Sequence, residues 1–306
     1  MEGLITKSTG SWYQVVTEDG QKYDCRIKGI FRTKGITTTN PIAVGDEVDF
    51  ELEPEQGTGL ITKLHQRRNY IIRKSINLSK QAQIIAANLD QALLIVTLAS
   101  PRTSLGFIDR FLVTAEAYDI PAALVFNKLD LFSDEGLEIL ADYKAIYENI
   151  GYPCYEVSAL NGTNVEQVSA IIKDKMTLFS GHSGVGKSSL INALVPELKL
   201  RTTEISEWHD KGVHTTTFAE MFELPQGGYI IDTPGIRELG VIDIEKNELS
   251  HFFPEMRALL NQCRFNSCRH INEPGCAVIK AVEEGDIELS RYESYLSIYH
   301  GNDTRA

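Results

Sequence analysis

One short segment restricts the fold of this chain more than any other feature. Residues 181–188, Gly-His-Ser-Gly-Val-Gly-Lys-Ser, come directly after the apolar stretch 176–180 and directly before the apolar helix start 189–194. The pattern G-x-x-x-x-G-K-S between a strand and a helix is typical of a P-loop, where glycine N–H groups and a helix N-terminus surround phosphate oxygens. The segment therefore predicts an α/β domain that binds a nucleoside polyphosphate.

The side chains of this loop have separate expected roles. Lys187 should reach the β- and γ-phosphates, and Ser188 should ligate a magnesium ion. A chance glycine loop is the alternative, and the flanking strand and helix argue against it. The expected nucleotide contacts are Gly181, His182, Ser183, Gly184, Val185, Gly186, Lys187, Ser188 and Ser189.

Two segments downstream fit the same site. Asp232 ends the apolar strand in 229-YIIDTPG-235, where an acid can hold magnesium through water and the N–H of Gly235 can sense the γ-phosphate. The intervening loop 212-GVHTTTF-218 can bring a threonine hydroxyl to magnesium, and we favour Thr216. The eligible threonines are Thr215, Thr216 and Thr217. A threonine-rich loop that only leads into a strand is the alternative.

A base-reading loop is expected upstream of the P-loop. The run Asn-Lys-Leu-Asp, which begins at Asn127, follows an apolar strand. The Asp130 carboxylate can accept hydrogen bonds from guanine N1–H and the exocyclic amine, a donor pair that adenine lacks, so it selects GTP over ATP. We expect Asn127 to brace neighbouring loops and the Lys128 stem to pack over the base. Ser158 and Ala159, after the next strand, should supply the N–H that reads guanine O6.

The order of these motifs differs from that of ordinary GTP-binding domains, in which the phosphate loop comes first. Here the base loop and Ser-Ala precede the P-loop, the threonine loop and Asp-Thr-Pro-Gly. Cutting the ordinary domain after Asp-Thr-Pro-Gly and joining its old ends, here through a helix predicted at 164–175, produces this order. A parallel sheet tolerates such a cut at surface loops. Residues 69–240 are therefore predicted to be a circularly permuted P-loop GTPase domain, with helices on both faces of a mainly parallel sheet.

Residues 1–68 are predicted to form a small all-β domain. Turn signals separate its five expected strands, which are 3–7, 12–16, 23–28, 47–52 and 59–64. Five strands in about 65 residues fit a closed barrel, and we favour an OB-fold over an SH3-like barrel. The runs 22–34 and 63–74 each contain five Lys or Arg residues. They indicate an RNA-binding surface, with an ordinary solvated face as the alternative.

Residues 241–306 are predicted to form a mostly helical zinc-binding domain. Cys263, Cys268, His270 and Cys276 offer three thiolates and one imidazole within fourteen residues, a closed tetrahedral set that would be structural. Reduced, buried cysteines beside an unrelated histidine are the alternative. The remaining cysteines, interpreted as ordinary strand side chains, are Cys25 and Cys154.

Bulk composition narrows the class of protein further. The net charge of −12 argues against a generic polyanion binder. No stretch approaches the ~18 apolar residues that cross a bilayer, and the first ten residues lack the apolar block of a secretory signal. We expect a soluble, cytoplasmic, monomeric protein with no membrane attachment.

Taken together, the permuted motifs, the flanking barrel and the terminal cysteine cluster resemble the circularly permuted bacterial GTPases called ribosome small-subunit-dependent GTPase A. The likeness covers essentially all 306 residues. The resemblance implies an N-terminal OB-fold, a permuted GTPase centre and a C-terminal zinc domain. It also implies binding to the small (30S) ribosomal subunit and its rRNA, and GTP hydrolysis that the subunit stimulates late in its maturation.

One catalytic element is absent from the pattern. Many Ras-like GTPases place a water-orienting Gln directly after Asp-x-x-Gly, and here Ile236 occupies that position. His214 is the local candidate for positioning the water, and the resemblance implies a switch histidine there. A plain loop histidine, and with it a slowly hydrolysing GTP- or GDP-sensing module on RNA, is the alternative. Because the chain runs from Gly235 straight into the zinc domain, we also predict that nucleotide state moves that domain.

Overall fold

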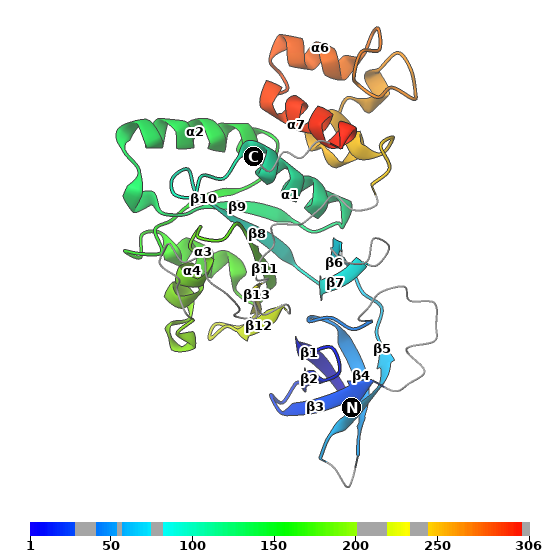
Figure 1. The fold of residues 1–306 in the computed structure, drawn as a ribbon, viewed down its shortest axis with the longest axis vertical. Helices are drawn as coiled ribbons and strands as arrows, with labels where there is room; N and C mark the ends of the chain where they lie inside the picture. The colour runs from blue at the N-terminus through cyan, green and yellow to red at the C-terminus, as the bar shows by residue number, and fades with distance from the viewer. Residues whose placement is uncertain (28–40, 54–56, 75–81, 201–218, 233–243, 302–306) are drawn as a thin grey trace, which may run out of the picture.

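The chain folds into a barrel, a central α/β domain and a helical C-terminal domain, arranged one after another (Figure 1). The computed structural model describes residues 1–306 except 28–40, 54–56, 75–81, 201–218, 233–243 and 302–306. The barrel lies at one end of the long axis and helices α6 (Ala277–Glu284) and α7 (Leu289–His300) at the other, with the central sheet between them. No helix among the described residues is both long and apolar enough to span a bilayer.

The N-terminal domain is a closed five-stranded barrel. Its strands are β1 (Glu2–Ser8), β2 (Tyr13–Val16), β3 (Lys22–Ile27), β4 (Glu47–Leu52) and β5 (Gly59–Leu64). The hydrogen-bonded order is β1-β2-β3-β5-β4, and a β1–β4 pairing closes the barrel. Alternate side chains such as Val15, Cys25 and Phe50 fill its core. The predicted OB-fold barrel is confirmed, and its parallel β3–β5 pair departs from a simple meander.

The central domain contains a mainly parallel sheet. Its strands are β8 (Gln91–Val96), β9 (Ala122–Phe126), β10 (Cys154–Glu156), β11 (Met176–Ser180), β12 (Glu220–Glu223) and β13 (Tyr229–Asp232). The order is β10-β9-β8-β11-β13-β12, in which only β12 runs antiparallel to its central neighbour. Both faces of β8 are buried, since Leu94 and Val96 belong to one hydrophobic cluster and Leu93 and Ile95 to another.

Helices cover both faces of this sheet, as the alternating sequence pattern predicts. The helices are α1 (Leu105–Ala117), α2 (Asp134–Asn149), α3 (Val165–Ile172) and α4 (Lys187–Leu194), with single 3₁₀ turns η2 (Leu129–Leu131) and η3 (Pro196–Leu198). Helix α1 begins at Leu105, because the Ser104 hydroxyl caps its first turn by accepting a hydrogen bond from Phe107 N–H at 3.3 Å. Phe107 and Phe111 pack with β8 in one cluster, and Val168 and Leu190 pack in the other.

A hairpin that the sequence analysis did not predict joins the barrel to the central domain. Strands β6 (Tyr70–Lys74) and β7 (Ala82–Ala87) pair antiparallel. The Asn88 side chain then donates to the Gly45 carbonyl of the barrel at 2.9 Å. Arg67 pairs with the fully buried Asp46 at 2.6 Å. Seven residues separate the two strands, so no tight-turn motif marks the hairpin in the sequence.

The barrel and the central sheet also share backbone pairing. Lys7 of β1 lies in antiparallel register with Glu220 of β12, which makes the two sheets one continuous eleven-stranded sheet. Strand β12 follows the threonine loop directly along the chain. The barrel is therefore attached to the strand that leaves that loop.

The C-terminal domain consists of short helices packed on α1. Its elements are η4 (Leu249–Phe252), α5 (Pro254–Arg257), η5 (Leu260–Gln262), α6 (Ala277–Glu284) and α7 (Leu289–His300). Val113 of α1 belongs to the same hydrophobic cluster as Phe253 and Tyr295. Beside this cluster Arg291, 1% exposed, pairs with Asp109 of α1 at 2.7 Å and with Glu255 of α5 at 2.8 Å. A hydrophobic cluster and a buried ionic group thus join the two domains.

Candidate functional site

The predicted nucleotide loops lie at one edge of the central sheet. The P-loop follows β11, the Asn-Lys-Leu-Asp loop follows β9, and Ser158 lies just beyond β10. These strands are parallel, so their carboxyl ends face the same way. Loops at the carboxyl ends of parallel strands form the ligand crevice of open α/β sheets. Segments that are far apart in the sequence therefore meet at one place.

Asn127 connects three of these loops. Its Nδ2 donates to the Val185 carbonyl of the P-loop at 2.9 Å, and its Oδ1 accepts from the Ala159 N–H at 3.0 Å. The side chain is 1% exposed, so each of these hydrogen bonds is protected from water. Any Cβ at residue 186 would collide with Asn127 Nδ2, which explains the glycine there. The Ala159 N–H already donates to Asn127 Oδ1. A guanine O6 that accepted from the same N–H would therefore share it with Asn127.

The expected guanine-reading carboxylate is oriented by its neighbours. The Ser158 hydroxyl donates a short hydrogen bond to Asp130 Oδ1, and Ser158 itself is fully buried. Lys128 has a left-handed backbone (φ 66°), and its Nζ donates to the Ser100 carbonyl at 2.6 Å. Burial lowers the pKa of Lys128, and the Asp130 charge opposes that shift. The exposed Asp130 carboxylate is thus held beside a lysine stem, the arrangement that base reading requires.

The P-loop has the backbone geometry that phosphate binding requires. Gly181 (φ 146°) lies so near the Ile95 carbonyl that a Cβ would collide with it. Lys187 Nζ donates to the carbonyls of Gly181 at 2.6 Å and His182 at 3.1 Å. Burial lowers the pKa of Lys187, and the nearby Asp232 carboxylate opposes that shift. The amine therefore lies inside the loop that its motif predicts.

The expected magnesium ligands lie partly within the described chain. Asp232 ends β13 beside Phe179 of the P-loop strand, and Ser188 and Ser189 occupy the first turn of α4. Hydroxyl and carboxylate oxygens are the donors that Mg²⁺ prefers, so this set fits the ion. Three predicted residues lie outside the described residues, and these are His214, Thr216 and Gly235.

Two contacts at the site were not predicted from the sequence. The loop between β8 and α1 supplies the Ser100 carbonyl that holds Lys128, and Pro101 lies 3.3 Å from where a Cβ at residue 184 would be. Phe107, in the first turn of α1, stacks on His182 of the P-loop with ring centroids 3.7 Å apart. Ser100, Pro101 and Phe107 belong to none of the predicted motifs. Only the position of β8 between the P-loop strand and the base-loop strand could have indicated them.

The second candidate site is the cysteine cluster. One ligand atom from each of Cys263, Cys268, His270 and Cys276 lies within 4.8 Å of the others. His270 Nδ1 is 3.6 Å from Cys263 Sγ and 3.3 Å from Cys276 Sγ. With metal–ligand bonds of about 2.0–2.3 Å, a tetrahedral Zn²⁺ site needs ligand separations of this size. The donor set and spacing therefore fit zinc and leave no open coordination position.

Neighbouring groups fix the backbone of this cluster. Burial alone would raise the pKa of Glu273, but hydrogen bonds from the N–H groups of Ile271, Arg269 and Asn272 outweigh it and lower the pKa to about 2. The Tyr292 hydroxyl donates to the His270 carbonyl at 2.7 Å. Burial raises the pKa of Cys268 to about 12. A bound cation is what would let the buried thiols ionise together.

Comparisons with known proteins agree along the chain. Residues 2–61 match the family model described as RsgA N-terminal domain, and residues 64–242 match RsgA GTPase. "Small ribosomal subunit biogenesis GTPase RsgA" of Bacteroides fragilis is 56% identical over 298 residues, covering 97% of this chain and 96% of that protein. The protein of the same name from Christiangramia forsetii is 55% identical over 309 residues, covering 99% and 97%.

Two solved structures share the whole architecture. YjeQ from Thermotoga maritima superimposes with a TM-score of 0.81 at 35% identity, covering 100% of this chain and 99% of that one. YloQ, described as a circularly permuted GTPase, superimposes with a TM-score of 0.75 at 33% identity, covering 98% and 94%. The permuted order predicted from the motifs is therefore shared with a solved structure.

Proposed function

This chain belongs to the RsgA family of GTPases, and on that basis we propose that it hydrolyses GTP to GDP and phosphate during biogenesis of the small ribosomal subunit. Its relatives carry that role in their names. We further propose that the loops around Asn127 are its GTP site and that the subunit stimulates hydrolysis.

The single observation that carries the proposal is the junction at Asn127. One buried side chain connects the P-loop to the segment after β10, and Asp130 lies three residues further along. A phosphate loop alone would fit many nucleotides. A carboxylate held by the Ser158 hydroxyl beside that loop selects guanine, because adenine lacks the two donors that such a carboxylate accepts.

A turnover assay with purified small subunits tests the proposal. We expect release of phosphate from GTP to rise when subunits are added, and excess ATP to compete poorly. Asp130→Ala should lower GTP affinity by about 10²- to 10³-fold and remove most of the GTP-over-ATP preference. A chain that binds guanine nucleotides but shows no stimulation would instead be a nucleotide sensor.

His214 is our proposed water-positioning residue, because Ile236 cannot orient water. The proposal rests on the sequence, since both positions lie outside the described residues. We expect His214→Ala to bind GDP normally and to lose about 10²-fold or more in subunit-stimulated turnover. Unchanged stimulated turnover in this variant would contradict the assignment.

We propose two metal ions with different roles. Mg²⁺ would accompany GTP, held by Ser188, by Thr216 and, through water, by Asp232, and would neutralise charge on the phosphates. Zn²⁺ would bind Cys263, Cys268, His270 and Cys276 and act structurally. The fit of both donor sets to these ions supports the proposal.

The proposed partners follow from the family and from charge. The barrel's basic runs, 22–34 and 63–74, would contact rRNA phosphates. We propose that the chain acts as a monomer in the cytoplasm, where small subunits are assembled. The proposed domains are 1–68, 69–240 and 241–306, with the β6–β7 hairpin at the first boundary.

A further inference from the structure

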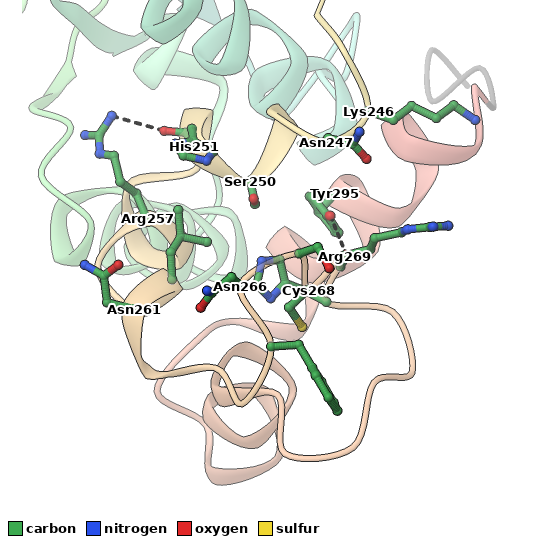
Figure 2. A pocket seen from close by; sticks show the side chains of 14 residues that line it. Lys246, Asn247, Ser250, His251, Arg257, Asn261, Asn266, Cys268, Arg269 and Tyr295 are labelled. Atoms are coloured by element: carbon green, nitrogen blue, oxygen red, sulfur yellow. Dashed lines mark hydrogen bonds between the residues drawn. The ribbon is translucent and has the colours of Figure 1, made fainter.

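A polar pocket lies in the C-terminal domain, away from the nucleotide loops. It has a volume of about 800 Å³ and lies between the segment 246–261, the knuckle 265–270 and α7. Figure 2 shows Ser250 near its centre, with Asn247, Asn266 and Arg269 around it. Its volume is in the range of about 300–1,000 Å³ that is typical of small-ligand pockets.

The charge of this pocket opposes that of the whole chain. Lys246, Arg257 and Arg269 line it, and among the residues that the structure describes no Asp or Glu does, although the chain carries a net charge of −12. Arg257 is partly neutralised by Glu116 of α1 at 2.9 Å. Lys246 lies over the Tyr299 ring with Nζ 5.1 Å from its centroid. The pocket therefore favours an anionic ligand.

Arg269 has a fixed backbone and an available head group. Its N–H donates to Glu273 Oε1 at 2.9 Å, and its carbonyl accepts from the Tyr295 hydroxyl at 2.6 Å. No ion pair of its guanidinium is found with any residue that the structure describes. A guanidinium on a fixed backbone is well suited to bidentate contact with a phosphate.

Uncharged polar groups also line the pocket. Ser250 is 4% exposed and lies among them. The amides of Asn247, Asn261 and Asn266 are exposed, and among the described residues no hydrogen bond of their side chains is found. Amides offer a donor and an acceptor together, which matches the edge of a nucleobase.

An aromatic surface completes the arrangement. Phe265 lines the pocket and is 44% exposed, and Arg264 lies over its ring at 5.5 Å. Exposed aromatic rings beside cations are the usual platform on which unpaired bases stack. An acidic peptide would use the cations, and its backbone would match the amides, but its carboxylate side chains would leave the exposed ring without a planar partner.

We propose that this pocket binds one unpaired nucleotide of a single-stranded RNA segment. The phosphate contacts Arg269, the base edge contacts the asparagine amides and Ser250, and the base stacks on Phe265. The inference rests on the proposed action on the small ribosomal subunit, whose RNA would supply the nucleotide. It assigns this part of the zinc-binding domain a reading role in addition to its structural one.

Photocrosslinking locates the contact directly. The full zinc-loaded chain, saturated with GDP so that the GTP site is occupied, is mixed with an unstructured RNA decamer containing 4-thiouridine. We expect crosslinked peptides within residues 244–270. Arg269→Ala should weaken binding about tenfold in fluorescence anisotropy and remove that crosslink. Arg269→Lys should have a smaller effect, because it keeps the charge and loses the bidentate contact.

Matched variants separate the base from the phosphate. Asn261→Ala with Asn266→Ala should weaken RNA binding about three- to tenfold and leave binding of an abasic decamer unchanged. Lys280→Ala removes an exposed charge on α6 outside the pocket and should change affinity less than twofold. Zinc content and thermal unfolding verify that each variant is folded.

The possible outcomes distinguish the alternatives. Crosslinks confined to residues 1–68, or an Arg269→Ala variant that binds like Lys280→Ala, would overturn the inference. Equal binding of a polyglutamate peptide, insensitive to the asparagine changes, would show that the pocket takes an acidic protein. If small subunits stimulate GTP turnover but no crosslink forms within residues 244–270, the pocket assignment is wrong and the proposed function stands. If the crosslink forms but subunits do not stimulate turnover, the proposed function is wrong and the pocket assignment stands.

Discussion

The nucleotide site and the cysteine cluster are assembled in opposite ways. The nucleotide site brings together Asn127, Ser158 and Lys187, from three loops spread over sixty residues, and a buried amide holds the loops together. The cysteine cluster takes all its ligands from residues 263–276. The first depends on a sheet that places distant loops side by side, whereas the second would need only an ion that joins a short segment. A motif is therefore sufficient to predict the second set of ligands, while the first also needs the fold.

Helix α1 contacts both regions. Phe107 in its first turn stacks on His182 of the P-loop. Two residues later Asp109 pairs with Arg291 of α7, and Tyr147 also donates to Asp109 at 2.9 Å. Burial opposes the charge of Arg291, but the carboxylates of Asp109 and Glu255 raise its pKa, so it stays protonated. Single substitutions in the cysteine cluster, at the α1–α7 contact and at the nucleotide loops should therefore change zinc content, stability and nucleotide affinity separately.

The largest expected effect is loss of the zinc site. Cys268→Ser should abolish stoichiometric zinc and most of the metal-linked stability, which is on the order of 10 kcal/mol for structural Zn²⁺. Because no cluster residue contacts the nucleotide loops that the structure describes, GDP affinity should change less than threefold. Atomic emission and nucleotide titration measure the two quantities. The control Cys154→Ser, in β10, should keep its zinc, and zinc retention in Cys268→Ser would show that the cluster is not a metal site.

The next effect concerns the junction of the two regions. Arg291→Met leaves Asp109 buried without its cation and should lower the free energy of unfolding by about 3–5 kcal/mol. Arg257→Met is the matched control, since its pair with Glu116 also crosses to α1 but is half exposed. That pair should be worth about 0–1 kcal/mol. Denaturant titration measures both, and equal losses would mean that burial does not decide the difference.

A smaller effect is expected within the nucleotide site. Asn127→Ala leaves the Val185 carbonyl and the Ala159 N–H without their partner. The cost of about 2–4 kcal/mol corresponds to roughly 30- to 1,000-fold weaker GDP binding, with zinc content unchanged. Asn161→Ala, which removes contacts only to Thr163 in an exposed turn, should bind nearly normally. A variant at 127 that binds GDP like wild type would mean that the loops do not need this junction.

The smallest effect tests the support of the cysteine cluster. Glu273→Gln should cost about 1–2 kcal/mol at pH 7, because an amide oxygen replaces a carboxylate that accepts from three N–H groups. The folded pKa of Glu273, about 2, is below its ordinary value of 4.5. Its stabilisation is therefore complete above pH 4.5 and lost as the pH falls toward 2. The stability difference between wild type and variant should shrink over that window in calorimetry, and a constant difference would contradict the assignment.

Much of this architecture could be predicted from local patterns. The strands at 47–52, 59–64 and 176–180 have the expected bounds. Each reflects alternating or continuous apolar residues between turn signals, which act over a few positions of the chain. The β6–β7 hairpin was missed because its strands are short and a long connection separates them. The helix predicted at 164–175 is shorter in the structure, Val165–Ile172, since apolar periodicity does not fix where a helix ends.

The expected chemistry of this protein can be predicted from its residues alone, because glycines, a lysine, a carboxylate and three thiols at fixed spacings have few other uses. The permuted order can be predicted as well, since motif order is a property of the chain. Three contacts follow from the tertiary structure instead: the pairing of β1 with β12 at Lys7 and Glu220, the stacking of Phe107 on His182, and the ion pair of Arg291 with Asp109. These contacts join residues up to 213 positions apart along the chain. No local pattern specifies such a partner, because the free energy of burial depends on which surfaces the whole fold brings together.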